Sequence, residues 1–568
     1  MKKILSFFLL IFCVSLLSAQ SGRPGIFDPD RSETYINAYV SSDMLQQVCH
    51  NFSVDNIIAA EHNCYTVRIC LSHNQYDEFL ALGIPFTFVS PLRANVRMAH
   101  NYAQLTNAWD RYPTYGTYTA LMDTFQRRFP NICKIDTILG HTDANHKLLV
   151  AHISNNLQDK GDKPSFFYTS TMHGDEPVGY YVMLRLIDYL LNNYESNSQV
   201  QNIIDNVDLW ICPLENPDGT YRNHNDSLNE SPYSTRHNYS DIDLNRSYPI
   251  AGESFNENGP YPDEVQAMLN FSQAHHFTMS ANFHGGAEVF NYPWDTWSSY
   301  QRTHADDDWW QYVGNNFAST CHDQNFFYMR DLYTGVTEGA DWYSITGSRQ
   351  DCHNYFLGCR EVTIEVSSDK VVSSSNLYKY WNYLRPSLLN YIEESLNGFR
   401  GVVLDSITGQ PIEATIFINN HDKYNSQVQS HLPAGDYHRP IKAGTYSVTY
   451  SADNYYPKTI TVNVADGECI VKNVQLVPTY VGINEIHDTP AFVIYPNPTH
   501  GYLYITSMMD PPKQFDFFMY DYSGRLIHQT KVDSGTSSLN ISSLPAGIYI
   551  IDIMDNGSVI YSTKIIKE

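Results

Sequence analysis

The sequence predicts an α/β domain, built on a mixed sheet with helices on both faces, with a small α/β segment before it and two β-sandwiches after it. Three observations lead to this fold class. The chain has 568 residues, enough for three or four domains of ordinary size. Helix-like and strand-like stretches alternate over residues 99–397, the rhythm of an α/β domain. After residue 398 only short alternating runs remain, separated by Gly, Pro and Asp turns, which is typical of β-sandwiches.

Residues 1–19 are predicted to be a secretory signal peptide. Lys2 and Lys3 precede an apolar run over residues 4–17, which is too short to span a membrane comfortably, and Ser18-Ala19 supplies a small-residue cleavage site. No later stretch approaches the length of a membrane helix. We therefore expect an exported protein with no transmembrane segment.

The composition excludes several classes of protein. With 42% hydrophobic and 17% charged residues, the chain is neither disordered nor fibrous. Its formal net charge of −25 argues against nucleic acid or an anionic membrane as the main partner. Cys13 lies in the signal peptide, so nine of the ten cysteines follow it. That odd number predicts at least one unpaired thiol unless processing removes some, and the spacings leave the pairing open.

Residues 20–98 form the predicted N-terminal segment. Two strands, NCYTVRICL and PFTFVSPL, lie on either side of a short helix, NQYDEFLALGI. The segment ends in RANVRMAH, where Arg93 and Arg97 are candidate protease sites. A small module before a larger domain is either a removable pro-region or a permanent accessory domain, and the sequence leaves both open.

The α/β domain over residues 99–397 is where we expect a functional site. Its pattern predicts amphipathic helices over residues 115–129 and 178–194, and apolar strands over residues 148–154 and 165–171 and in VDLWIC. Roughly 300 residues can bury a large core. Open α/β sheets bind ligands at the carboxyl ends of their strands, so polar residues that follow strands are the candidates.

The stretch TMHGDEPVGYY follows one of these strands and holds the first candidate pair. The strand would deliver His173, and Pro177 suits the first turn of the next helix, so Glu176 would lie near the N-terminus of that helix. A hydrolytic zinc site needs three nitrogen or oxygen ligands and an open position for water, and this pair supplies two. The alternative is a solvated loop in which Glu176 complements the helix dipole.

Three further stretches supply candidates. His284 ends the alternating run TMSANFH, before two glycines that let the backbone turn close to an ion. Arg236, Asn245 and Arg246 lie in the polar stretch STRHNYSDIDLNRSYP. Glu365 lies on the polar face of EVTIEV, where a covered carboxylate needs a partner or a role. Taken singly, these residues have ordinary alternatives: a structural histidine, surface charge and a half-exposed edge strand.

Together these stretches resemble the zinc metallocarboxypeptidases, and most closely their regulatory branch, carboxypeptidases D, E and N. The resemblance covers about residues 101–477. It rests on HGDE, NPDG, R-x-N with DLNR, HGG with NYPWD, WYS with QD, and EVTIE, all in the family's order. Agreement of so many motifs by chance is very improbable, so the ordinary alternatives lose most of their weight.

The resemblance implies a catalytic centre with one Zn²⁺ ion. His173, Glu176 and His284 would hold the ion, the two-His, one-Glu set of the family. Glu365 would be the general base on the zinc-bound water and then the proton donor to the leaving amine. Arg236 would polarise the scissile carbonyl and stabilise the oxyanion.

The resemblance also implies how a substrate is held. Asn245 and Arg246 would grip the free C-terminal carboxylate of a peptide or protein, because a guanidinium can bind a carboxylate through two hydrogen bonds. Tyr343, 22 residues before Glu365 as in the family, would close over the substrate. Asp295 and Gln350 match the branch's pocket for a basic side chain. We therefore expect removal of C-terminal Lys or Arg.

The sequence departs from the family at four positions near the site. Arg349 stands where relatives usually have an uncharged residue, Cys352 replaces an aromatic one, and Ser247 and Tyr248 replace the usual Asn and Phe of DLNRNFP. Arg349 is the departure that would weaken a basic preference. Two other functions stay open: the same scaffold with apolar or cell-wall peptide specificity, and an inactive binding or adhesion protein on the carboxypeptidase fold.

The rest of the chain is predicted to serve folding and export. Residues 398–477 resemble the transthyretin-like β-sandwich that follows the catalytic domain in this branch, and residues 478–490 are a linker. Residues 491–568, from YPNPTHG through LPAGIY to KIIKE, resemble the C-terminal sorting domain of type IX secretion. That resemblance implies a secretion machinery as partner, passage across the outer membrane, and a secreted or surface-attached product. The alternative is a permanent β-sandwich.

Overall fold

A computed structural model describes most of the chain. Its described residues are 33–61, 63–89, 94–222, 225–226, 228, 234–479, 492–507, 513–533, 535–555 and 557–568. The predicted signal peptide, Arg93 and most of the predicted linker lie outside them. The chain divides into two compact units, Met1–Val477 and Pro478–Glu568, which are described separately. No helix among the described residues is both long and apolar enough to cross a membrane.

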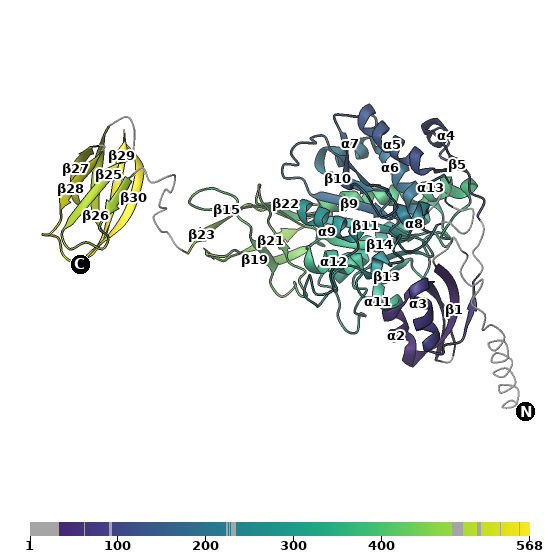
Figure 1. Cartoon of the computed structure of the whole chain (residues 1–568). Coiled ribbons are helices and arrows are strands. Elements are labelled where there is room, and N and C mark those ends of the chain that lie inside the picture. The colour runs from purple at the N-terminus through teal and green to yellow at the C-terminus, as the bar shows by residue number, and fades with distance from the viewer. Residues whose placement is uncertain are drawn as a thin grey trace, which may run out of the picture. The chain divides into compact units, whose positions relative to one another are not determined.

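The N-terminal segment folds as a four-stranded antiparallel sheet with two helices. The strand order is β2-β3-β1-β4. Figure 1 draws this segment in purple, with β1, α2 and α3 labelled. The helix α3 begins with a capping box, in which Ser72 and Gln75 satisfy each other's backbone N–H groups. The helices and the sheet bury a small apolar core of their own. The elements are β1 (Glu33–Ser41), α2 (Ser42–Asn51), β2 (Ser53–Glu61), β3 (Cys64–Ser72), α3 (His73–Ala81) and β4 (Phe86–Phe88).

An eight-stranded mixed sheet forms the centre of the first unit, which confirms the predicted α/β fold. The strand order is β13-β12-β14-β11-β9-β10-β8-β7. The four inner strands β14, β11, β9 and β10 are parallel, whereas β8 and β12 pair with them antiparallel. The strands are β7 (Cys133–Leu139), β8 (Leu148–Ile153), β9 (Ser165–Ser170), β10 (Asp208–Cys212), β11 (Met279–His284), β12 (Glu288–Tyr292), β13 (Val336–Glu338) and β14 (Arg360–Val366).

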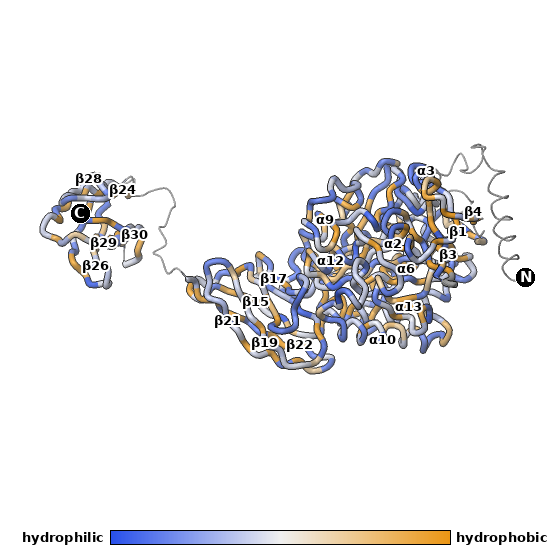
Figure 2. Tube along the Cα trace, turned by 90° about the horizontal axis from the view of Figure 1, so that it is seen from below, coloured by the Kyte–Doolittle hydropathy of each residue, from blue (hydrophilic) through white to orange (hydrophobic). Residues whose placement is uncertain are grey.

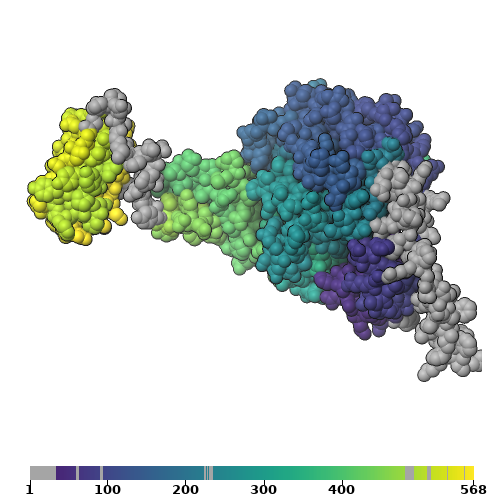
Figure 3. Space-filling view, in the orientation of Figure 1, coloured from purple at the N-terminus to yellow at the C-terminus, as the bar shows by residue number. Residues whose placement is uncertain are grey.

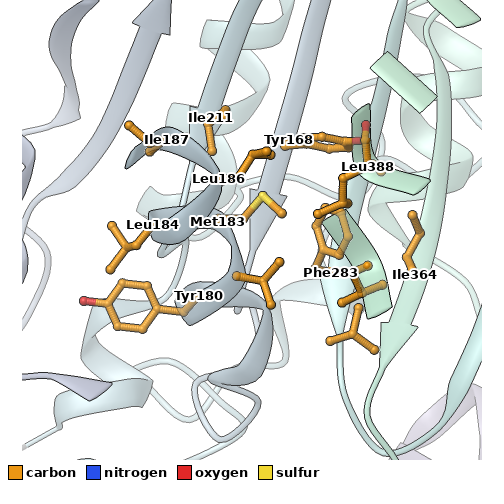
Figure 4. Packing of buried hydrophobic residues seen from close by; sticks show 14 of the residues in the cluster. Tyr168, Tyr180, Met183, Leu184, Leu186, Ile187, Ile211, Phe283, Ile364 and Leu388 are labelled. Atoms are coloured by element: carbon orange, nitrogen blue, oxygen red, sulfur yellow. The ribbon is translucent and has the colours of Figure 1, made fainter. Parts of the chain in front are cut away.

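Helices cover both faces of this sheet, as the sequence predicts. Successive residues of a strand point to opposite faces. In β9, Phe166 and Tyr168 therefore join the larger core cluster and Phe167 joins the smaller one. Figure 4 shows part of the larger cluster, where Met183 and Phe283 pack with Tyr168. The larger cluster lies under α5 (Tyr115–Arg128), α6 (Val178–Asn193), α7 (Ser198–Asn206), α10 (Asp307–Gln324) and α13 (Leu377–Glu393), and the smaller under α9 (Asp263–His275) and α12 (Arg349–Phe356).

A β domain follows α13, with two sheets that share one apolar core. A buried ionic cluster joins it to the α/β domain: Arg439 and Arg360 both donate to Asp306, at 2.7–3.1 Å. The likeness to transthyretin stays a prediction. Its strands are β15 (Gly398–Asp405), β16 (Thr415–Ile418), β17 (Val428–Gln429), β18 (Asp436–Arg439), β19 (Gly444–Ser451), β20 (Tyr455–Tyr456), β21 (Lys458–Val464), β22 (Cys469–Val471) and β23 (Val474–Pro478).

The second unit consists of strands only, within its described residues. Two antiparallel sheets, β24-β25-β28 and β27-β26-β29-β30, enclose a core of alternate apolar residues. Hydrophilic and hydrophobic residues alternate along these strands (Figure 2). The strands are β24 (Phe492–Tyr495), β25 (Tyr502–Ser507), β26 (Gln514–Asp521), β27 (Leu526–Asp533), β28 (Thr536–Asn540), β29 (Gly547–Asp555) and β30 (Ser558–Lys567).

All nine cysteines that follow the predicted signal peptide lie among the described residues, and none of them forms a disulfide bond. Seven are buried, and Cys64 is exposed. The seven buried cysteines therefore pack as small apolar residues.

Candidate active site

The ends of two neighbouring parallel strands bring the candidate metal ligands together. β9 ends at Ser170, three residues before His173, and β11 ends at His284. Glu176 lies next to Pro177, the residue that caps α6. Because β9 and β11 pair in parallel, their carboxyl ends lie at the same edge of the sheet. Residues 111 positions apart in the sequence thereby become neighbours.

The three side chains converge at their donor atoms. The Nδ1 atoms of His173 and His284 are 2.9 Å apart, and the carboxylate of Glu176 lies 3.0 Å from the His284 nitrogen and 3.2 Å from the His173 nitrogen. All three side chains are buried. Two ring nitrogens that face each other at this distance cannot both carry a proton, so at least one of them presents a lone pair to this space. Two imidazoles and a carboxylate aimed at one point fit a zinc ion.

Electrostatics favour the form of His284 that can bind a metal. Burial, with His173 as the next contribution, lowers the pKa of His284 to about 4. The imidazole is therefore neutral at pH 7, which is the state a metal ligand requires.

Asp243 holds one of these ligands, and the sequence reasoning did not select it. Its carboxylate lies 3.1 Å from Nε2 of His173, on the side of the ring away from the cluster. A carboxylate in this position fixes the orientation of a metal-binding imidazole and makes it more basic. The same carboxylate accepts a hydrogen bond from Nε of Arg236 at 3.0 Å. Its only signal in the sequence is its place at the start of DLNR.

Glu365 lies beside the cluster, on an inner strand. β14 pairs in parallel with β11, so that Glu365 is directly opposite His284. β14 runs between β11 and β12, and the alternative of a half-exposed edge strand is therefore wrong. One carboxylate oxygen of Glu365 is buried and accepts no hydrogen bond from the described residues. Burial, followed by the charge of Glu176, raises the pKa of Glu365 well above its usual value. A carboxyl group in this setting can take up and release a proton.

Two arginines and an asparagine line the same cavity. Arg236 lies 3.6 Å from Glu176, and Arg246 and Asn245 belong to the loop that follows Asp243. The amide oxygen of Asn245 accepts a hydrogen bond from the backbone N–H of Arg349 at 3.0 Å. Nε of Arg246 is buried and has no hydrogen-bond partner among the described residues. The loop thus presents donors for an anionic group.

Asp295 lines the cavity too, and Asn291 connects it to Gln350. Asn291 donates to Asp295 at 3.2 Å, and Gln350 lies 3.5 Å from the amide oxygen of Asn291. Gly339 makes room for the carboxylate, because a Cβ atom there would lie 2.0 Å from Oδ1 of Asp295. Burial raises the pKa of Asp295. Tyr343 also lines the cavity.

The N-terminal segment fills this cavity. Asp55, on β2, makes an ion pair with Lys370 at 2.6 Å and another with Arg236 at 3.4 Å. The neighbouring carbonyl of Val54 accepts a hydrogen bond from Arg246 at 3.2 Å. The volume left is about 30 Å³, room for one water molecule and not for a peptide residue. No motif or periodic pattern in the sequence pointed to Asp55 or Lys370 as a residue of the site.

Further contacts fix the N-terminal segment over the site. Figure 3 shows this segment, in purple, packed against the α/β domain. The hydroxyl of Tyr35 donates to Asp175, between the two metal-ligand candidates, at 2.5 Å. Glu33 accepts hydrogen bonds from the backbone N–H of Arg236 and from the ring of His237, both at 2.7 Å. Tyr343 packs against the core of the segment. The segment therefore touches several of the predicted site residues.

Comparison with known proteins identifies related sequences. Residues 118–387 match the family described as zinc carboxypeptidase, and residues 493–568 match the secretion system C-terminal sorting domain. Carboxypeptidase SOL1 of Arabidopsis thaliana is 31% identical over 357 residues, which cover 62% of this chain and 69% of that protein. The carboxypeptidase N catalytic chain of Rattus norvegicus is 30% identical over 362 residues, 58% of this chain and 78% of its own length.

Carboxypeptidase D of Mus musculus is 32% identical over 384 residues, 64% of this chain but 27% of that protein. The chain therefore spans about a quarter of the length of this longer relative.

Proposed function

Because the chain belongs to the zinc carboxypeptidase family, we propose that it is an exported enzyme that removes C-terminal Lys or Arg from peptides and proteins. One observation carries the proposal: the metal-binding atoms of His173, Glu176 and His284 converge in a cavity that also contains Glu365 and Arg236. A zinc ion held there would act as a Lewis acid and lower the pKa of water.

The surrounding residues divide the chemistry among them. Arg246 and Asn245 would bind the terminal carboxylate, which confines cleavage to the last peptide bond because internal bonds lack that charge. Arg236 would stabilise the negative charge that develops on the carbonyl oxygen. Glu365 would take the proton from the attacking water and pass it to the leaving amine.

The specificity proposal rests on the buried carboxylate of Asp295 and on the orientation of the Arg349 side chain, which points away from the cavity. Asp295 is a buried carboxylate in the cavity, without a cation of its own at hydrogen-bond distance among the described residues. A terminal Lys or Arg would supply that cation. Arg349 does not oppose this, because its side chain points away from the cavity into ion pairs with Glu361 and Glu215.

Peptides that end in Arg, Lys, Phe or Glu test the proposal, with and without a zinc chelator. We expect hydrolysis of the Arg and Lys peptides, its loss with chelator, and its loss in Glu365→Gln. Preference for Phe, or Asp295→Ala with undiminished Arg activity, would indicate an apolar or cell-wall peptide specificity. Purified protein without zinc, or full activity in Glu365→Gln, would indicate a binding protein.

We also propose that residues 20–98 are a removable pro-region. The support is the occupation of the cavity by Asp55 and the contact of Val54 with Arg246. The backbone N–H of Arg97 donates a hydrogen bond to Ser374 at 2.7 Å, and its carbonyl accepts one from the backbone N–H of Tyr112 at 3.1 Å. Because these bonds hold the Arg97 backbone in the fold, we favour Arg93 as the cleavage site.

Limited proteolysis tests the pro-region. Cleavage after Arg93, identified by N-terminal sequencing, should raise the rate of hydrolysis of the Arg peptide, and Arg93→Gln should remain uncut and slow. A rate that does not change on removal of the segment would make it a permanent accessory domain.

The remaining parts concern export. The sorting domain indicates a secreted or cell-surface protein. We propose that it is recognised by the secretion machinery, and that the transthyretin-like β domain over residues 398–477 supports folding of the enzyme. Deletion of residues 491–568 should keep the protein inside the producing cell, and its appearance outside in normal amount would contradict this role.

A further inference from the structure

Two of the departures from the family's motifs meet in the interior. Arg349 and Tyr248 both contact Glu215, a residue that the sequence analysis did not select. The hydroxyl of Tyr248 donates to Glu215 at 2.8 Å, and a terminal nitrogen of Arg349 donates to the other carboxylate oxygen at 3.2 Å. Residues that depart from a common motif and yet bind one another suggest a shared role.

Glu361 completes this group. Nε of Arg349 donates to its two oxygens at 2.9 and 3.2 Å, and Arg349 and Glu361 are both 0% exposed. Burial by itself would raise the pKa of Glu361, but Arg349 and His353 outweigh it and lower that pKa. Glu361 is therefore the ionised partner of the guanidinium. We call Arg349, Glu215, Glu361 and Tyr248 the Arg349 network.

The network reaches four segments that carry proposed site residues. Glu215 follows β10, and its backbone N–H donates to the carbonyl of Ser170, at the end of the strand that leads to His173. Tyr248 lies two residues after Arg246. Glu361 lies in β14, four residues before Glu365, and Arg349 is the first residue of α12.

The start of α12 is the point where the network meets substrate binding. The backbone N–H of Arg349 holds Asn245 at 3.0 Å. The next residue, Gln350, accepts a hydrogen bond from the backbone N–H of Thr363 at 2.7 Å while it faces Asn291. A shift of this helical turn would therefore move a residue of the carboxylate clamp and a residue of the basic pocket together.

We propose that Arg349 is a positioning residue for substrate binding. Through Glu215 and Glu361 it holds the first turn of α12 against the inner strands and against the loop of Asn245 and Arg246, so that the terminal carboxylate and the terminal side chain are bound in one geometry. The proposal rests on the proposed carboxypeptidase function. A buried charge that is paired on two sides fixes a position more strongly than apolar packing, since displacement would leave an unpaired charge.

Arg349→Met tests the proposal through binding and turnover separately. We expect KM for an Arg-terminated peptide, and the inhibition constant of free L-arginine, to rise about 10- to 100-fold, the range known for loss of an outer partner of a metal ligand. The value of kcat should change by less than about threefold, because Glu365 and the zinc ligands are untouched. Zinc content should stay at one ion per chain. Full chains are compared before and after the same limited proteolysis.

Arg360→Met is the matched control. Arg360 is also a buried arginine ion-paired to a carboxylate, but it joins the β domain through Asp306. It should lose stability while KM stays unchanged. A lower melting temperature of Arg349→Met with unchanged KM would overturn the proposal, because it would show a structural role only.

A second variant tests whether a raised KM comes from the loss of positioning by Arg349 or from the carboxylate that is left unpaired when Arg349 is removed. In Arg349→Met/Glu361→Gln no unpaired carboxylate remains at residue 361, and Glu215 keeps the hydrogen bond from Tyr248, so part of the lost stability should recover while KM stays high. Recovery of KM as well would overturn the proposal. If Arg349→Met does not fold, Arg349→Lys replaces it, since lysine keeps the charge but cannot bind two carboxylates as the guanidinium does. Its KM should rise by a smaller factor, and an unchanged KM would refute the positioning role. A wild-type chain that cleaves no peptide would contradict the proposed function instead.

Discussion

Replacing Asp55 by alanine should open the active site without any cut in the chain. The Asp55 side chain is 5% exposed and bridges Lys370 and Arg236, at 2.6 and 3.4 Å. These are the only ion pairs between β2 and the cavity in the described part of the chain. Their loss should weaken the closed arrangement while the metal-ligand candidates stay in place.

The free-energy cost of Asp55→Ala depends on the ion pairs that Lys370 and Arg236 retain in the variant. Removing one member of a buried ion pair costs about 3–5 kcal/mol when the other is left alone. Here Lys370 keeps Glu176 at 2.7 Å and Arg236 keeps Asp243 at 3.0 Å, so the cost is lower. We take about 2 kcal/mol, which is about a thirtyfold shift toward the open state at about 1.4 kcal/mol per factor of ten.

The assay is the rate of hydrolysis of an Arg-terminated peptide by intact chains, with gel analysis to show that none is cut. Asp55→Ala should be up to about thirty times faster than wild type, and both should converge after proteolytic removal of residues 20–98. The control is Asp43→Ala, on an exposed position of α2 in the same segment. Equal rates for Asp55→Ala and wild type before cleavage would refute the reasoning.

Three further predictions concern single side chains. Asp243→Asn should weaken zinc binding about 10- to 100-fold, measured by competition with a chelator, because the ring of His173 loses its anionic partner; an unchanged zinc Kd would contradict this. Gly339→Ala should lower the ratio of kcat/KM for Arg over Phe peptides, since the new methyl group would displace Asp295, and an unaltered ratio would show that the carboxylate is not the determinant. Burial raises the pKa of Glu264 from 4.5 to about 7, so the native state binds the extra proton and stability falls as pH rises between these values. Glu264→Gln should therefore be more stable than wild type at pH 8, by up to about 3 kcal/mol, and equal to it at pH 4; thermal melts that show the same difference at both values would disprove the shift.

Local patterns made the fold predictable, whereas the candidate site was predicted from the resemblance of several motifs to the zinc carboxypeptidases. The period of two in EVTIEV and the longer apolar period over residues 178–194 decide strand and helix within a few residues, because the side chains of each element must share a buried face. The metal-ligand candidates could be placed for a similar reason. His173 comes shortly after one strand-like run and His284 ends another, and strand ends gather at one edge of a parallel sheet.

The order of strands in the sheet needed the tertiary structure. Alternation in EVTIEV is compatible with an edge strand or an inner one, since it states only which residues share a face. Pairing of β14 with β11 on one side and β12 on the other places Glu365 on an inner strand, opposite His284. The direction of Arg349 was also undetermined, because the carboxylates that draw it inward come from residues 12 and 134 positions away.

The sequence by itself therefore determined the helices and strands, since helix period, strand period and turn residues act over short distances. The candidate site residues came from the resemblance of its motifs to the zinc carboxypeptidases. Only the tertiary structure decided what those residues touch. Asp55 meets Lys370 across 315 positions, and no local pattern marks either residue. Their contact exists because the N-terminal segment and the α/β domain, each with its own apolar core, pack together with complementary charge, and that surface is defined only by the tertiary structure.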